Sequence, residues 1–396
     1  MARGISLNRR TFLISTSGAA AGVAATGLAG TGAHAQDGAL PEYAAWKDPD
    51  ALIVHTDRTL ETRREAIGAP PITPARELFV RNNLPTPPLS ATDDPDVWEI
   101  AFEGVASPAT MTLGELKRYG VTSTPAVLQC SGNGRAFFDH EASGTQWSVG
   151  AAGNVVWTGV PLARVVEAMG GAAAEARFLT GTGGEDLPPG IDPLTILVER
   201  SVPIEALDDA LLAYEMNGEP LPIAHGGPVR LVVPGYFGVN NVKYVRRIAL
   251  TPAESEAKIQ RTSYRIRPVG VEGDPSQPSM WTMTVKSWIT APLHEPSSGA
   301  VVIQGVAMGG ASALSSVEVS TDGGETWQAA ELTGPDMGRF AWRPFALVTT
   351  LEPGRYTVAS RATNADGDEQ PRDFDPNERG YGHNGWDAHA VELTVS

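Results

Sequence analysis

The sequence predicts a two-domain protein in which an α+β domain precedes an all-β, immunoglobulin-like sandwich. Three observations support this prediction. Roughly 360 residues follow an N-terminal export-type segment, and this length exceeds one comfortable hydrophobic core. Strand-like and helix-like patterns are mixed between residues 76 and 252. Beyond residue 284 only short alternating strands occur, at the spacing typical of a sandwich.

Residues 1–35 are typical of a twin-arginine signal peptide. Arg9 and Arg10 form the arginine pair, an uncharged Gly- and Ala-rich stretch runs from Thr11 to Gly32, and Ala33-His34-Ala35 supplies a cleavage pattern. The stretch favours a cleaved signal over a membrane anchor, because it is poor in Leu, Ile and Val. We therefore expect export of the folded protein to the periplasm and no membrane anchor.

The mature chain begins with an arm, residues 36–75, for which we expect irregular structure and a short helix near Thr59–Ile67. The α+β domain and the first part of a linker occupy residues 76–265. Its strands are predicted by β-branched and aromatic residues at Val97–Val105, Ala126–Gln129, Val229–Val233 and Val242–Ile248. Its helices are predicted at Thr112–Gly120, which starts with a Thr cap, and at Val160–Gly171; both end on Gly.

Residues 253–283 show no sustained periodicity and are rich in Pro and Gly, which predicts a linker that reaches back toward the first domain. In residues 284–396, apolar and polar residues then alternate with a period of two, which is typical of strands. Asp322-Gly323-Gly324 stands at a hairpin position between two such runs. This region is the predicted sandwich.

Cys130 is the only cysteine of the chain, so it has no internal disulfide partner. An inert core position is one reading, because free cysteines are among the most buried residue types. Arg135 and the intervening SGNG turn favour a functional site, since glycine lets a ligand approach the backbone closely. A zinc site is not indicated, because it needs about four N or S ligands in close motifs. The net charge of −16 argues against a nucleic-acid partner.

Six segments, in order, resemble the sulfite oxidase family of molybdenum enzymes. They are LFVRNNLPTP (78–87), LQCSGNGR (128–135), LLAYEMNGEPLPIAHGGPVRLVVPG (211–235), VKYVRRI (242–248), IQRTSY (259–264) and ERGYGHNGW (378–386). The resemblance covers close to the whole mature chain. It implies that residues 76–265 hold the molybdopterin-binding catalytic domain and residues 284–396 an immunoglobulin-like dimerisation domain.

The resemblance implies a molybdenum-molybdopterin cofactor with Cys130 as the one protein ligand to the metal. A bound metal ion deprotonates a coordinating thiol outright, so a single cysteine suffices. Ten residues are implied for the pterin and its phosphate: Phe79, Val80, Arg81, Asn82, Asn83, His225, Arg230, Asn241, Val242 and Lys243. We expect no haem in this chain, because it has no CxxCH motif.

Five residues are implied around the substrate: Arg81, Arg135, Trp147, Tyr264 and Arg379. Sulfite and related sulfur oxyanions are small anions, which guanidinium groups bind through charge-assisted hydrogen bonds. A tyrosine phenol is an uncharged hydrogen-bond donor at neutral pH. Without the resemblance, each arginine is more often a surface residue and Trp147 is as often an ordinary core aromatic.

The chain departs from the family at two places. Asn83 stands where the family commonly has a histidine, which replaces an imidazole by an amide. The animal members also carry a lysine between the cysteine and the tryptophan, and the segment from Cys130 to Trp147 has none. We expect less positive charge around the substrate and relaxed selectivity among sulfur compounds.

The resemblance implies oxidation of sulfite to sulfate, with electrons passed singly to an external c-type cytochrome, and a homodimer formed through the C-terminal domain. Two alternatives remain open. One is the molybdenum subunit of a sulfane dehydrogenase, which acts on carrier-bound sulfur in thiosulfate oxidation. The other is a secreted binding module without catalysis, which the C-terminal strands alone would satisfy.

Overall fold

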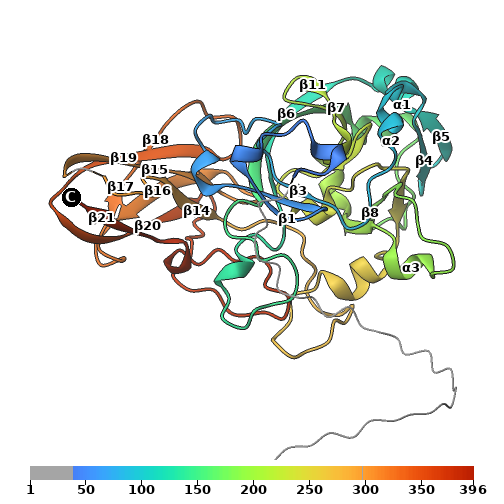
Figure 1. Cartoon of the computed structure of the whole chain (residues 1–396). Coiled ribbons are helices and arrows are strands. Elements are labelled where there is room, and N and C mark those ends of the chain that lie inside the picture. Colours follow the sequence, from blue (N-terminus) through green and yellow to red (C-terminus); the bar gives the residue numbers. More distant parts are fainter. Residues whose placement is uncertain (1–38, 297) are drawn as a thin grey trace, which may run out of the picture. The chain divides into compact units, whose positions relative to one another are not determined.

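The computed structural model describes residues 39–296 and 298–396, so the predicted signal peptide, residues 1–35, lies outside the described residues. The described part contains the α-helices α1 (Leu113–Leu116), α2 (Leu162–Ala168) and α3 (Pro193–Ile196) and a π-helical turn, Ile259–Ser263. None of its helices is long and apolar enough to cross a membrane. Strands therefore dominate the structure (Figure 1).

Three sheets form the region before residue 252. The first joins β1 (Leu52–Thr56), β2 (Thr59–Thr62) and β3 (Val80–Arg81). The second has, in this order, β5 (Ala109–Thr112), β4 (Glu99–Glu103), β13 (Arg247–Thr251), β8 (Phe178–Thr182) and β9 (Glu199–Pro203). The third has, in this order, β11 (Glu219–Pro220), β10 (Leu211–Met216), β7 (Ala152–Pro161) and β6 (Thr122–Gln129). A further strand, β12 (Arg230–Val232), also pairs with β10.

Two four-stranded sheets form the C-terminal region. One has the order β14-β15-β19-β18, with bounds Lys286–Ala291, Gly299–Met308, Arg343–Leu351 and Glu331–Leu332. The other has the order β17-β16-β20-β21, with bounds Gln328–Ala329, Leu314–Ser320, Gly354–Asn364 and Val391–Val395. Their inward side chains share one hydrophobic cluster that includes Ile303, Val319 and Val358. The predicted order, α+β followed by an all-β sandwich, is confirmed.

Short 3-10 helices connect these elements. They are Glu42–Ala44, Pro49–Ala51, Arg64–Ala66, Leu89–Thr92, Pro95–Val97, Lys117–Tyr119, Arg135–Phe137, Ile204–Asp208, Ile223–His225, Gly238–Asn240 and Asp387–His389. The predicted helix at Thr112–Gly120 is present as α1 and one 3-10 turn. Its start is a capping box, in which the Glu115 N–H donates to Thr112 Oγ1 at 3.2 Å and the Thr112 N–H donates to Glu115 Oε2 at 2.9 Å.

Two sequence-based expectations are wrong. Thr59–Ile67 is not one short helix, because Thr59–Thr62 is β2, the middle strand between β1 and β3, with all four side chains buried; only Arg64–Ala66 forms a 3-10 turn. The arm is thus partly a sheet. The strand expected at Val242–Ile248 begins only at Arg247, because Tyr244 has φ 53, a left-handed conformation that does not fit a strand.

The two regions share a further hydrophobic cluster. It contains Val127 of β6, Trp288 of β14 and Trp342, together with Tyr264 from the linker. The linker also bonds back to the first region, since the Arg200 guanidinium of β9 donates to Ile259 O at 2.9 Å and to Ser279 Oγ at 3.0 Å. The predicted return of the linker is confirmed, and it brings Tyr264 to the end of β6.

Candidate active site

Cys130 lies directly beyond the end of β6, where pairing with β7 runs to Gln129 opposite Ala152. Its N–H donates to Ala151 O at 2.9 Å, so the cysteine is fixed by one further ladder bond. The tight turn that follows needs glycine at Gly134, whose φ of 93° lies in the left-handed region. The thiol is partly exposed and borders two cavities. The structure therefore does not support an inert core cysteine.

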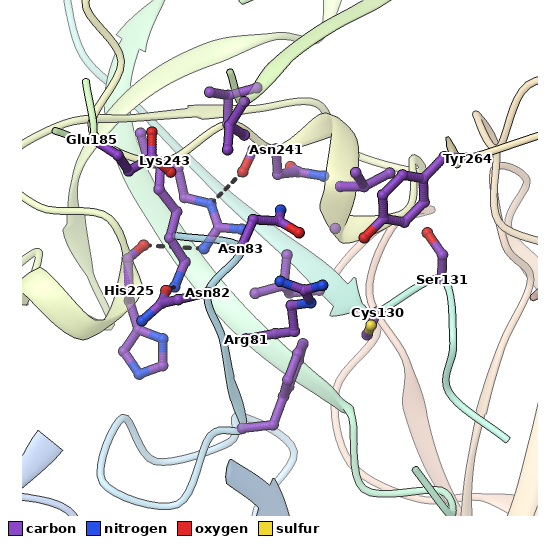
Figure 2. A pocket seen from close by; sticks show the side chains of 17 residues that line it. Arg81, Asn82, Asn83, Cys130, Ser131, Glu185, His225, Asn241, Lys243 and Tyr264 are labelled. Atoms are coloured by element: carbon purple, nitrogen blue, oxygen red, sulfur yellow. Dashed lines mark hydrogen bonds between the residues drawn. The ribbon is translucent and has the colours of Figure 1, made fainter. Parts of the chain in front are cut away.

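The first cavity extends from Cys130 past Arg81. Figure 2 shows Arg81 between two groups, with Cys130, Ser131 and Tyr264 on one side and His225, Lys243 and Glu185 on the other. Nine of the ten residues predicted for the pterin line this cavity: Phe79, Arg81, Asn82, Asn83, His225, Arg230, Asn241, Val242 and Lys243. Val80 does not, because its side chain packs with Leu60 and Ala224 in a core cluster.

Three buried polar atoms on the wall of this cavity have no hydrogen-bond partner among the described residues: Asn82 Nδ2, Ser131 Oγ and His225 Nε2. Buried polar atoms are normally paired, because leaving one unpaired costs roughly 1 to 3 kcal/mol. A ligand rich in hydrogen-bonding groups satisfies this need. The lining therefore fits a pterin cofactor.

Most of the charged side chains that line this cavity are positive. Arg230 is buried, and its guanidinium donates to Asn241 O and to His225 O, both at 3.0 Å (Figure 2). Lys243 Nζ donates to Asn82 Oδ1 at 2.5 Å, and burial together with Arg230 lowers the pKa of Lys243 well below its usual value. Burial and the nearby lysines likewise lower the pKa of His225. An anion such as a phosphate relieves this repulsion, so the charges fit the cofactor as well.

The second cavity, of about 900 Å³, lies on the other side of Cys130. It contains all five residues predicted around the substrate: Arg81, Arg135, Trp147, Tyr264 and Arg379. Cys130, Arg81, Asn83 and Tyr264 line both cavities, so one cysteine separates a cofactor-sized site from an arginine-lined site. This division supports the predicted roles, although the assignment of each residue stays a prediction.

The three arginines are held differently. Arg135 is buried, and its Nε and Nη1 donate to Arg379 O at 2.9 Å and Thr145 O at 2.7 Å. Arg379 Nε is buried and has no hydrogen-bond partner within residues 39–296 and 298–396. Burial lowers the pKa of Arg81, but Tyr264, Cys130 and Tyr381 more than offset this and raise the pKa above its usual value. Arg81 therefore stays a cation beside the thiol.

Several residues of the site were not predicted. Tyr381 lines the second cavity, and Ser131 and Glu185 line the first. Burial raises the pKa of Glu185 to about 7, so this carboxyl is partly protonated at neutral pH. Lys47 of the arm is buried next to the first cavity, and it donates to Ala75 O at 2.6 Å and Leu78 O at 2.7 Å. No sequence pattern singles out Lys47, whereas Ser131 and Tyr381 stand inside the motifs that resemble the family.

Two family descriptions match the chain. "Oxidoreductase molybdopterin binding domain" matches residues 85–259, and "Mo-co oxidoreductase dimerisation domain" matches residues 277–395. The predicted cofactor class is confirmed by the first match. Residues of the first matched region make up most of the lining of both cavities, and Arg379 and Tyr381 of the second matched region line the second cavity.

Known proteins resemble the chain over most of its length. Mitochondrial sulfite oxidase of Homo sapiens is 35% identical over 373 residues, which cover 87% of this chain and 66% of the relative. Sulfite oxidase of Gallus gallus is 31% identical over 339 residues, covering 80% of this chain and 72% of the relative. The solved structure of the sulfane dehydrogenase SoxCD from Paracoccus pantotrophus superposes with a TM-score of 0.71 at 28% identity, covering 85% of this chain and 86% of that chain. The chain spans about two thirds of the length of the human relative.

Proposed function

This chain belongs to the sulfite oxidase family of molybdopterin oxidoreductases, and from that membership we propose that it oxidises sulfite to sulfate in the periplasm. One observation carries the proposal. The cavity lined by Arg81, Arg135 and Arg379 meets the cofactor-sized cavity at Cys130. A small sulfur oxyanion bound by the arginines lies next to the place where Cys130 would hold the metal.

The chain's own residues bind and orient the anion. An arginine side chain offers five N–H donors, and Arg135 uses two of them on backbone carbonyls, so the others remain for substrate. Arg379 contributes its Nε, which is unpaired in the part of the chain that the structure describes. Tyr264 supplies an uncharged donor to the same cavity, and Trp147, which is 1% exposed, adds an apolar surface to its lining.

Cys130 would hold the molybdenum, and the first cavity would hold the pterin and its phosphate. When bound, this cofactor supplies two-electron oxidation of sulfur and releases the electrons one at a time. An external c-type cytochrome is the proposed acceptor. The acidic chain, with its net charge of −16, would attract a basic cytochrome at low ionic strength.

A second function is favoured by a specific observation, the likeness to the sulfane dehydrogenase SoxCD over 85% of this chain. The name of that enzyme, sulfane dehydrogenase, implies a substrate other than free sulfite. The chain also lacks a lysine between Cys130 and Trp147, which fits a less cationic site. In this alternative the substrate is sulfur bound to a carrier protein. Family membership counts against a binding module without catalysis.

Purified, molybdenum-loaded protein tests the proposal. We expect it to reduce cytochrome c when free sulfite is added. Turnover of carrier-bound sulfur without any turnover of free sulfite would select the sulfane dehydrogenase instead. Turnover of neither would reject both functions.

We also propose a homodimer and export to the periplasm. The homodimer is supported by the match of residues 277–395 to a dimerisation domain. Export is supported only by the twin-arginine pattern of residues 1–35. Fractionation of cells that express the full chain, compared with an Arg9→Lys, Arg10→Lys variant, tests the export proposal. Equal periplasmic yield of the two would overturn it.

A further inference from the structure

Four side chains next to the second cavity form a continuous stack, which we call the tyrosine stack: Arg200, Tyr264, Tyr381 and Arg135. The rings of Tyr264 and Tyr381 are parallel within 7°, and their centroids lie 5.0 Å apart. The guanidinium carbon of Arg200 lies 5.6 Å from the Tyr264 ring centroid, and that of Arg135 lies 5.4 Å from the Tyr381 ring centroid. Each ring thus contacts one ring and one guanidinium.

We propose that Tyr381 is a positioning residue, whose ring holds the Arg135 guanidinium and the Tyr264 phenol against the substrate cavity and thereby sets the affinity for a sulfur oxyanion. The inference rests on the proposed function, because it concerns the same arginine-lined site. It goes further, because it assigns a role to a residue that the comparisons leave without one.

Tyr381 is fixed by its backbone, so its ring is a rigid support. The Tyr381 N–H donates to Asn377 Oδ1, and Asn377 Nδ2 donates to Tyr381 O, both at 2.9 Å. The next residue, Gly382, donates its N–H to Ser131 O at 2.8 Å. Gly380 and Gly382 have φ values of 58° and 73°, so glycines allow the turn on both sides. The segment that carries Tyr381 is therefore tied to the turn that follows Cys130.

The ring of Tyr381 matters more than its hydroxyl. The hydroxyl donates to Ser263 O at 3.4 Å, a long hydrogen bond. The electron-rich ring face attracts the Arg135 guanidinium, and the parallel ring contact supports Tyr264. Burial raises the pKa of Tyr381 to about 12, so the phenol adds no negative charge that would repel an oxyanion.

The position of Arg135 depends on this support. Its Nε and Nη1 are directed to the carbonyls of Arg379 and Thr145, which fixes the plane of the guanidinium on one edge. The Tyr381 ring supports the face of that plane. Without the ring the guanidinium is free to tilt away from the cavity. A loss of anion affinity follows, for the product sulfate as much as for sulfite.

The test compares Tyr381→Leu, Tyr381→Phe and Phe374→Leu in the molybdenum-loaded protein. Phe374 lies on the same loop and contacts Phe138 and His383, but it lines neither cavity discussed above, so its variant controls for general loosening of the loop. The readouts are the dissociation constant for radiolabelled sulfate by equilibrium dialysis, the KM and kcat for sulfite, and the molybdenum content.

We expect Tyr381→Leu to raise both the dissociation constant for sulfate and the KM for sulfite about tenfold, because the variant loses one ring contact and one guanidinium contact. The kcat should change less. Tyr381→Phe and Phe374→Leu stay within about twofold of wild type in this view. Unchanged sulfate binding in Tyr381→Leu at full molybdenum content, or an equal loss in Phe374→Leu, would overturn the inference. If wild type binds sulfate but oxidises no sulfite, the proposed function fails. The role of Tyr381 is then tested only by the sulfate dissociation constants of wild type and the variants, measured by equilibrium dialysis. If wild type binds no sulfate, the inference fails too.

Discussion

Replacement of Lys286 by Met tests how the sandwich supports the Cys130 turn. Lys286 begins β14, is 1% exposed, and has no ion-pair partner among the described residues. Its Nζ donates to His383 O at 2.7 Å and to Asn133 O at 3.4 Å, so one ammonium joins the turn after Cys130 to the segment that carries Tyr381. The groups facing it are the buried rings of His383, His389 and Trp288.

Burial lowers the pKa of Lys286 from 10.5 to about 7. Between pH 7 and pH 10.5 the unfolded chain therefore holds a proton that the folded protein has released, and the stability of the folded state rises with pH. Each pKa unit corresponds to about 1.4 kcal/mol, so the change is on the order of 5 kcal/mol across this window and about 4 kcal/mol between pH 6.5 and pH 10. Below pH 7 both states hold the proton and the full cost of burying the charge is present.

Lys286→Met removes this titration, so the stability of wild type relative to the variant should rise by that amount between pH 6.5 and pH 10. Urea unfolding of both proteins across the range measures the difference, because ionisations common to both cancel. Lys117→Met is the matched control, since Lys117 is a partly exposed lysine paired with Asp96. A difference between wild type and Lys286→Met that stays constant with pH would refute the reasoning.

Three further predictions concern the site and the assembly. Cys130→Ser should leave the midpoint of urea unfolding unchanged. It should reduce the rate of sulfite oxidation by more than roughly 100-fold, the cost of losing a contact that only supports a metal ligand, because a hydroxyl is a poor substitute for the thiolate. Substantial residual oxidation would count against a ligand role for Cys130. Arg379→Gln should raise the KM for sulfite about 10- to 100-fold, which corresponds to the loss of one charge-assisted hydrogen bond, and should leave the thermal stability unchanged. An unaltered KM in steady-state assays would show that Arg379 does not belong to the anion site. Light scattering after size exclusion should give twice the chain mass at micromolar concentration, and a monomer there would argue against the homodimer.

The sequence predicted the site well where chemistry is concentrated in short motifs. Cys130, Arg135 and Arg81 stand in such motifs, and the structure brings all three to the junction of the two cavities. Tyr264 was harder, because it stands in a segment without periodicity. Only the return of the linker, fixed by the hydrogen bonds of Arg200, places it there.

The remaining residues are defined by contacts that no local pattern encodes. Lys47 and Lys286 read as ordinary surface lysines in the sequence, yet each is buried and donates to two backbone carbonyls far away in the chain. Tyr381 is supported by a ring more than 100 positions earlier. The Thr59–Ile67 error has the same origin, because β2 exists through pairing with β1 and β3 and not through a helix or strand pattern of its own.

X-ray absorption at the molybdenum edge tests the central claim, that Cys130 holds the metal between the two cavities. In wild type we expect three sulfur neighbours of the metal, two from the pterin dithiolene and one from Cys130. In Cys130→Ser loaded with the same cofactor we expect two. Three sulfur neighbours in the variant, or two in wild type, would contradict the account.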